Sequence, residues 1–88
     1  MHDKTILIAD NSIINRMQMG GILASEYNIL EADNGHDALD IMRERGKDGI
    51  DAVLLDLHMP GQTGFDVLAE KQANPAIADI PVIVITAD

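Results

Sequence analysis

Short apolar runs that end in polar residues recur along the chain and constrain its fold more than any other feature. They occupy residues 5–9, 27–32, 51–57 and 81–86. The first and last are apolar on both faces, which is typical of strands buried in a parallel sheet. Segments of helical spacing separate the runs, so strands and helices alternate from one end to the other. This order predicts a parallel α/β sheet with helices on both faces and right-handed crossovers.

Three helices are expected between these strands. The first covers about residues 12–25, with Ser12 as its N-cap. Gly46 closes the second, and a capping box of Thr63 and Asp66 opens the third. The expected apolar stripe of the first helix consists of Ile13, Ile14, Met17, Gly21 and Ala24.

Composition excludes several classes of function. The chain has 88 residues, enough for one small domain, and a formal net charge of -9. Such an acidic chain repels nucleic acids and anionic membrane surfaces. The absence of cysteine excludes disulfides and thiolate metal sites. No apolar run reaches ~18 residues and no signal peptide is evident, so a cytoplasmic protein is expected.

Polar residues stand at the carboxyl ends of three expected strands, where open parallel sheets bind ligands. They are Asp10 and Asn11, Asp56, and Thr86. Two carboxylates and an amide make an oxygen site that suits Mg²⁺. A carboxylate beside this ion can attack a phosphoryl group. A single aspartate at a strand end is, however, more often a cap or a solubilising group, and Thr86 alone is an ordinary β-branched strand residue.

Residues 6–12, 54–64 and 80–87 together resemble the receiver domain of bacterial two-component response regulators. The middle segment carries Asp-x-x-Met-Pro-Gly-x-x-Gly, and Asn34-Gly35 resembles the family's entry to its second helix. The resemblance covers residues 1–88 as one domain. It implies a flavodoxin-like (CheY-like) doubly wound sheet in the order 2-1-3-4, with the fifth strand of that fold missing from this chain.

The resemblance also implies a role for each matching residue. Asp56 corresponds to the aspartate that accepts a phosphoryl group from a histidine kinase, and Asp10 to a carboxylate that holds Mg²⁺. His58 corresponds to a residue that binds the metal through its backbone carbonyl. Thr86 corresponds to the hydroxyl residue that contacts the phosphoryl group, and Ala87 to the small residue beside it.

Two features depart from the family pattern. Asn11 stands where the family usually has a second acidic metal ligand, so weaker Mg²⁺ binding is expected. The chain also stops at Asp88, before the family's fourth helix, fifth strand, phosphoryl-contacting lysine and fifth helix. An alternative function is therefore a pseudo-receiver, which binds partners without phosphorylation. A third hypothesis, a Mg²⁺-dependent phosphohydrolase, is disfavoured because His58 occupies the position of its second aspartate.

The expected partners follow from the resemblance. They are a sensor histidine kinase or phosphotransfer protein, and any output domain would lie downstream of Asp88. The domain transfers phosphate onto itself and so is not expected to be an enzyme, nor to bind nucleic acid or membrane. If 88 residues are the whole polypeptide, residues 81–86 form an apolar sheet edge, and dimerisation, element swapping or aggregation is expected.

Overall fold

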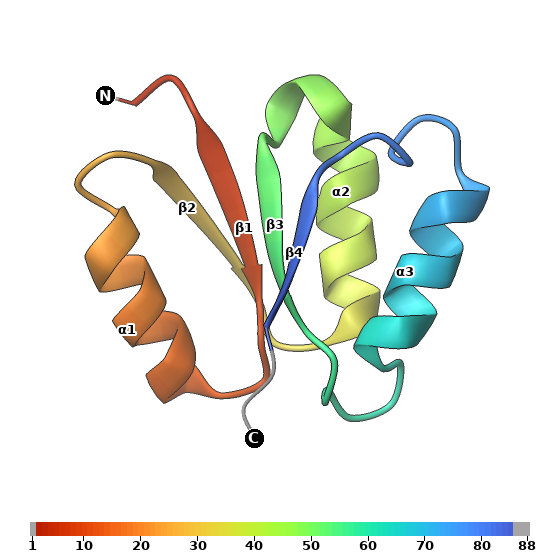
Figure 1. Cartoon of the computed structure of the whole chain (residues 1–88), viewed down its shortest axis with the longest axis horizontal. Helices are drawn as coiled ribbons and strands as arrows, with labels where there is room; N and C mark the ends of the chain where they lie inside the picture. The colour runs from red at the N-terminus through yellow and green to blue at the C-terminus, as the bar shows by residue number, and fades with distance from the viewer. Residues whose placement is uncertain (1, 86–88) are drawn as a thin grey trace.

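The computed structural model describes residues 2–85, which form a four-stranded sheet and three helices (Figure 1). Strands and helices alternate along the chain, as predicted. The elements are β1 (Thr5–Ala9), α1 (Ile13–Leu23), β2 (Asn28–Ala32), α2 (Gly35–Gly49), β3 (Ala52–Asp56), α3 (Gly64–Ala73) and β4 (Val82–Ile85).

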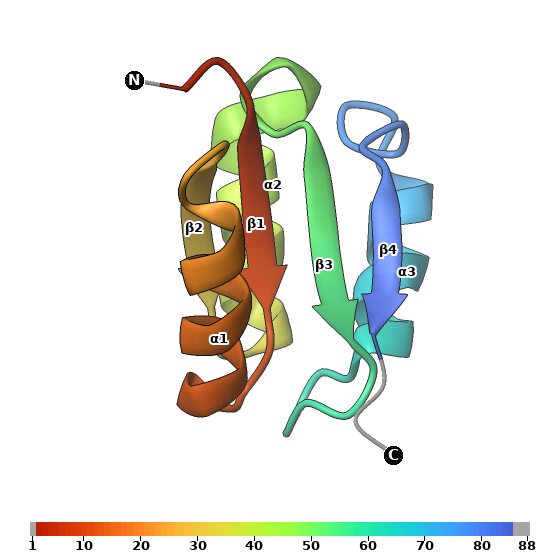
Figure 2. The ribbon, with the colours of Figure 1, turned by 60° about the vertical axis from the view of Figure 1, so that its left-hand side comes forward.

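The sheet has the order β2-β1-β3-β4, and every pair of neighbouring strands is parallel. Leu7 in β1, for example, lies between Leu30 in β2 and Val53 in β3. The predicted strand order is therefore confirmed. Because all strands run in one direction, their carboxyl ends gather at a single edge (Figure 2).

The helices cover the two faces of the sheet unequally. α2 and α3 pack on one face, and α1 alone lies on the other (Figure 1). The main apolar core lies between the sheet and the α2–α3 layer. It includes Leu7, Ala9, Leu39, Met42, Val53, Leu55, Val67, Ile77 and Ile80. No residue of α1 is fully buried, so this helix contributes little to the core.

The apolar stripe predicted for α1 is wrong. Ile13, Ile14 and Met17 are 61%, 63% and 67% exposed. The partly buried side of the helix instead comprises Asn15, Arg16, Met19, Gly20 and Leu23. The physical reason is polar: Asn15 and Arg16 form hydrogen bonds with Asp10 at the end of β1, and these bonds set the rotation of the helix.

The predicted starts of α1 and α3 are confirmed, whereas α1 ends at Leu23 rather than near residue 25 and α2 runs past Gly46 to Gly49. Ser12 caps α1, because its hydroxyl accepts the Asn15 N–H at 3.2 Å. Thr63 and Asp66 form the predicted capping box at the start of α3. Gly46 interrupts α2 with a φ of 67°, a conformation that favours glycine, and a short turn continues to Gly49. None of the helices in residues 2–85 has the length and apolar character needed to cross a membrane.

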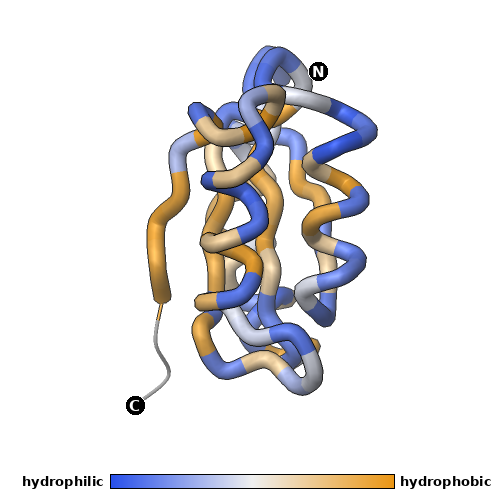
Figure 3. The backbone as a smooth tube through the Cα atoms, turned by 90° about the vertical axis from the view of Figure 1, so that its right-hand side faces the viewer, coloured by the Kyte–Doolittle hydropathy of each residue, from blue (hydrophilic) through white to orange (hydrophobic). Residues whose placement is uncertain are grey.

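β4 forms one edge of the sheet and is hydrophobic along its length (Figure 3). Ile83 and Val84 are 56% and 44% exposed. Within residues 2–85, β4 pairs only with β3, so its outer backbone groups have no strand partner there. The expected self-association through this edge stays a prediction.

A buried lysine ties the connection between α3 and β4 to the body of the domain. Lys71 is only 3% exposed, and its Nζ donates a hydrogen bond to the Ala78 carbonyl at 2.5 Å. The same connection buries Ile77 and Ile80 in the core. Burial lowers the pKa of Lys71, and the negative charge of Asp79 offsets part of that effect.

Two glycine substitutions should have opposite effects on stability. A Cβ on Gly64 would lie 2.5 Å from the Asp56 carbonyl oxygen, whereas one on Gly21 would have nothing within 4 Å. Gly64→Ala should lower the free energy of unfolding by roughly 1–3 kcal/mol because the backbone must shift. Gly21→Ala should raise it by up to ~1 kcal/mol through helix propensity. Urea unfolding followed by circular dichroism tests both, and effects of equal sign would contradict this packing.

The buried Lys71 should make stability depend on alkaline pH. Burial lowers the pKa of Lys71 in the folded state below its usual value of 10.5, so the unfolded chain binds this proton more tightly. The free energy of unfolding contributed by this group should therefore rise with pH across the interval between the lowered pKa and 10.5. The difference between wild type and Lys71→Met in urea unfolding should grow in favour of wild type over this interval. A difference that shrinks with rising pH would contradict the assignment.

Candidate functional site

Asp10 and Asp56 lie side by side at the carboxyl edge of the sheet. Ala9 pairs with Leu55 in the parallel β1–β3 ladder, and the two aspartates follow these residues directly. Neighbouring strands are about 4.8 Å apart, so the two carboxylates belong to one site. They are only 2% and 4% exposed. The sequence predicted this convergence, and the register provides it.

The amino-terminal turn of α1 holds the Asp10 carboxylate. Oδ1 accepts a hydrogen bond from the Ser12 N–H at 2.8 Å, and Oδ2 accepts one from Asn15 Nδ2 at 3.3 Å. Ser12 therefore serves both the helix cap and the acidic residue before it. Both carboxylate oxygens of Asp10 are thus held by N–H donors from the first turn of α1.

The Asp56 carboxylate is held at one oxygen only. Oδ1 accepts the His58 N–H at 2.9 Å. Among residues 2–85, no donor forms a hydrogen bond with Oδ2. The arrangement fixes the side chain through one oxygen while the other keeps its lone pairs for a ligand or a reaction.

The segment after β3 is packed tightly against the site. Gly64 N–H donates to the Leu57 carbonyl at 3.3 Å, and the absence of a side chain on Gly64 lets it approach the backbone of Asp56. Met59 is buried, and Gly61 adopts a φ of 71°. These contacts place the beginning of α3 directly beside the backbone carbonyl of Asp56.

The other residues predicted for the site differ in where they lie and how exposed they are. Asn11 follows Asp10 directly and is exposed. The His58 side chain is exposed, in keeping with a role for its backbone alone. Thr86 and Ala87 lie outside the described residues. Asn15 and Arg16 are not identified from the sequence, because the spacing of the apolar residues predicts that the opposite side of α1 is buried.

The charges of the site suit a divalent cation. Within residues 2–85 neither Asp10 nor Asp56 takes part in an ion pair. Two buried, adjacent carboxylates without a cation are electrostatically unfavourable. Oxygen ligands of this kind fit Mg²⁺ better than they fit a softer transition metal.

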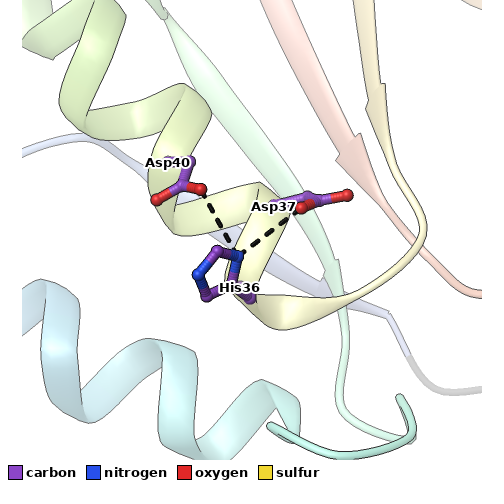
Figure 4. A group of neighbouring side chains, drawn as sticks. All are labelled: His36, Asp37 and Asp40. Atoms are coloured by element: carbon purple, nitrogen blue, oxygen red, sulfur yellow. Dashed lines mark ion pairs between the residues drawn. The ribbon is translucent and has the colours of Figure 1, made fainter.

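A second group of possible metal ligands lies at the start of α2, where His36, Asp37 and Asp40 approach one another (Figure 4). His36 Nδ1 lies 3.6 Å from Asp37 Oδ1 and 3.3 Å from Asp40 Oδ2. His36 and Asp37 are exposed, and Asp40 is about half exposed. Asp37 also accepts from Asn34, and Asp40 from Arg43. We interpret this group as ion pairs on the surface of the first turns of α2 rather than as a metal site.

The chain belongs to the response regulator receiver domain family, whose model matches residues 6–88. It is 42% identical over 82 residues to a probable cyclic di-GMP phosphodiesterase of Vibrio cholerae, covering 93% of this chain and 18% of that protein. The chain spans 18%, 44% and 11% of the lengths of three curated relatives that it matches.

Solved receiver structures share the fold. The phosphorylated cyanobacterial phytochrome response regulator RcpA is 26% identical with a TM-score of 0.85, covering 97% of this chain and 66% of that chain. The Mn²⁺-bound form of response regulator Rcp1 is 27% identical with a TM-score of 0.83 and the same coverage. The flavodoxin-like α/β fold that the resemblance implied is confirmed.

Neutralising one buried carboxylate should stabilise the metal-free domain. Two unit charges at the spacing of neighbouring strands, about 5 Å, repel by about 3 kcal/mol at an effective dielectric constant of about 20, and solvation offsets part of this repulsion. Asp56→Asn keeps an acceptor for the His58 N–H and should raise the free energy of unfolding by about 1 kcal/mol. Urea unfolding with a chelator present measures this effect, and the exposed Asp48→Asn is the matched control. A destabilised Asp56→Asn would show that the two charges do not repel appreciably.

Proposed function

We propose that this domain is a phosphoacceptor of a two-component phosphorelay and that Asp56 receives the phosphoryl group. The observation that carries the proposal is the carboxylate of Asp56, which is fixed through Oδ1 and has no described donor at Oδ2. It lies beside a second buried carboxylate, Asp10, in a family of signalling domains. The phosphorylated neighbour RcpA supports the proposal.

The donor is a phosphohistidine of a sensor kinase or phosphotransfer protein. Asp56 Oδ2 attacks the phosphorus atom and forms the new P–O bond of an acyl phosphate, while the P–N bond breaks. The bonding electrons return to the imidazole nitrogen, which takes up a proton from solvent. The hydrogen bond from His58 N–H holds the carboxylate in place during the attack.

Mg²⁺ is the proposed cofactor, with the carboxylates of Asp10 and Asp56, the amide oxygen of Asn11 and the backbone carbonyl of His58 as ligands. When bound, this ion neutralises charge on the phosphoryl oxygens. The two buried aspartates, which form no ion pair within residues 2–85, support the assignment, as does the Mn²⁺-bound neighbour. Asn11 contributes an oxygen but no charge, so binding should be weak.

The signal passes to a partner rather than to a small-molecule product. Thr86 and Ala87 follow the last residue of β4 in the sequence, and we assign to them the phosphoryl-contacting hydroxyl and the small residue beside it that the resemblance implies. Phosphorylation would then alter the surface near β4, and an output domain would respond. Whichever activity accompanies this domain in the whole protein, the domain itself acts as the switch.

A pseudo-receiver is the second candidate function. The observation that favours it is Asn11, since an amide in place of a carboxylate weakens the charge of the site. In that case the fold and its surface bind a partner, and Asp56 stays unmodified.

Asp56 should carry the phosphoryl group after treatment with a small phosphodonor and Mg²⁺. Intact-mass and peptide spectra should show a single adduct on wild type and none on Asp56→Asn, while Asp66→Asn should remain modified. An adduct that persists in Asp56→Asn would assign the site elsewhere. No adduct on the wild type would favour the pseudo-receiver, and continuous phosphate release would indicate a phosphohydrolase.

Restoring a carboxylate at position 11 should strengthen Mg²⁺ binding. A unit charge a few ångströms from the ion contributes several kcal/mol before desolvation, so a net gain of ~1–2 kcal/mol is expected. Asn11→Asp should then bind Mg²⁺ roughly tenfold more tightly in a calorimetric titration. Asn28→Asp, which lies at the opposite end of the sheet, is the control. Equal affinities of Asn11→Asp and wild type would show that residue 11 is not a ligand.

A further inference from the structure

All four polar atoms of Asp10 have protein partners. Besides the two carboxylate contacts, its N–H donates to the Ala32 carbonyl of β2 at 3.0 Å. Its own carbonyl accepts a hydrogen bond from Arg16 Nη1 at 2.6 Å. The Arg16 bond stands out, because it is the shortest of the four and comes from a charged donor.

Arg16 is itself held in position. Its side chain is 13% exposed, and its Nε donates to Glu31 Oε1 at 3.0 Å. Glu31 lies in β2, so one guanidinium connects α1, the end of β1 and β2. The planar guanidinium group can bind both acceptors at once in a fixed geometry, which an ammonium group cannot reproduce.

The carbonyl that Arg16 binds belongs to the peptide group between Asp10 and Asn11. The orientation of this peptide sets the direction in which Asn11 leaves the strand and the position of the Asp10 side chain beside Asp56. Nothing else within residues 2–85 forms a hydrogen bond with this carbonyl. The peptide is therefore oriented by α1 through Arg16.

We infer that Arg16 is a positioning residue for the metal site, holding the Asp10–Asn11 peptide so that both side chains present their oxygens to Mg²⁺. This inference deepens the proposed function and rests on it for the identity of the ion. Arg16 touches neither the metal nor the phosphoryl group and acts through Asp10 and Glu31.

Whether removal of Arg16 weakens or tightens Mg²⁺ binding distinguishes a positioning role from a purely electrostatic one. As a bare positive charge near the site, Arg16 would repel Mg²⁺, and its removal would tighten binding. As a positioning residue it makes the ligands available, and its removal weakens binding. Loss of an outer contact to a metal ligand typically costs 10–100-fold in affinity.

The experiment is a calorimetric Mg²⁺ titration of the full chain without phosphodonor. Arg16→Gln should raise the dissociation constant about tenfold, and Arg16→Lys should raise it less. Arg43→Gln is the matched control, because Arg43 also bridges two carboxylates, Asp40 and Glu70, but on the α2–α3 surface. It should bind Mg²⁺ as wild type does.

Two further measurements exclude a general loss of structure. In the metal-free protein, the amide resonance of Asn11 should shift and exchange faster in Arg16→Gln but not in Arg43→Gln. Glu31→Gln should weaken Mg²⁺ binding moderately, and the double variant Arg16→Gln/Glu31→Gln should be no weaker than Arg16→Gln, because the two residues act as one unit. If Arg16→Gln does not fold, Arg16→Lys and Glu31→Gln carry the test.

The outcomes are distinct from those of the phosphorylation experiment. A wild type that binds Mg²⁺ but takes no phosphoryl group overturns the proposed function and leaves this test valid. Unchanged or tighter Mg²⁺ binding by a folded Arg16→Gln, with an unshifted Asn11 amide, overturns the inference and leaves the phosphoacceptor role of Asp56 intact.

Discussion

The adjacent buried carboxylates of Asp10 and Asp56 impose the main electrostatic constraint on this structure. The parallel register places both at the same level of the sheet, and the residues beneath them belong to the apolar core. Backbone donors from Ser12 and His58 compensate part of the charge. No ion pair within residues 2–85 compensates the rest, so the site retains an electrostatic preference for a cation.

The orientation of α1 follows from this constraint. A helix with several apolar residues would normally bury them, since burial of one such side chain is worth roughly 1.5–3 kcal/mol. Here Asn15 and Arg16 face the sheet and contact Asp10, and Ile13, Ile14 and Met17 remain exposed. The Asn15 bond ends on the Asp10 carboxylate and the Arg16 bond comes from a charged donor, and hydrogen bonds that involve a charged group are worth about 1.5–3 kcal/mol each. Because the polar side of α1 contacts the site, the apolar side with Ile13, Ile14 and Met17 stays exposed within residues 2–85.

On the other face, the site is built into the contact between sheet and helices. Gly64 brings the start of α3 onto the Asp56 backbone, and a Cβ on Gly35 would lie 2.6 Å from the Gln62 carbonyl oxygen. The loop after Asp56 is thus packed against both α2 and α3.

The sequence by itself determined the alternation of elements, the caps at Ser12 and Thr63, and the presence of acidic residues at the ends of β1 and β3. These features are local, because apolar periodicity and capping chemistry depend on residues close together in the chain. The strand order came from the family resemblance, since many orders satisfy the same pattern. Only the tertiary structure decided the rotation of α1 and the contacts of Arg16. The apolar residues of α1 predicted one buried face, but the competing hydrogen bonds involve Asp10 and Glu31, whose proximity exists only once β1 and β2 are paired.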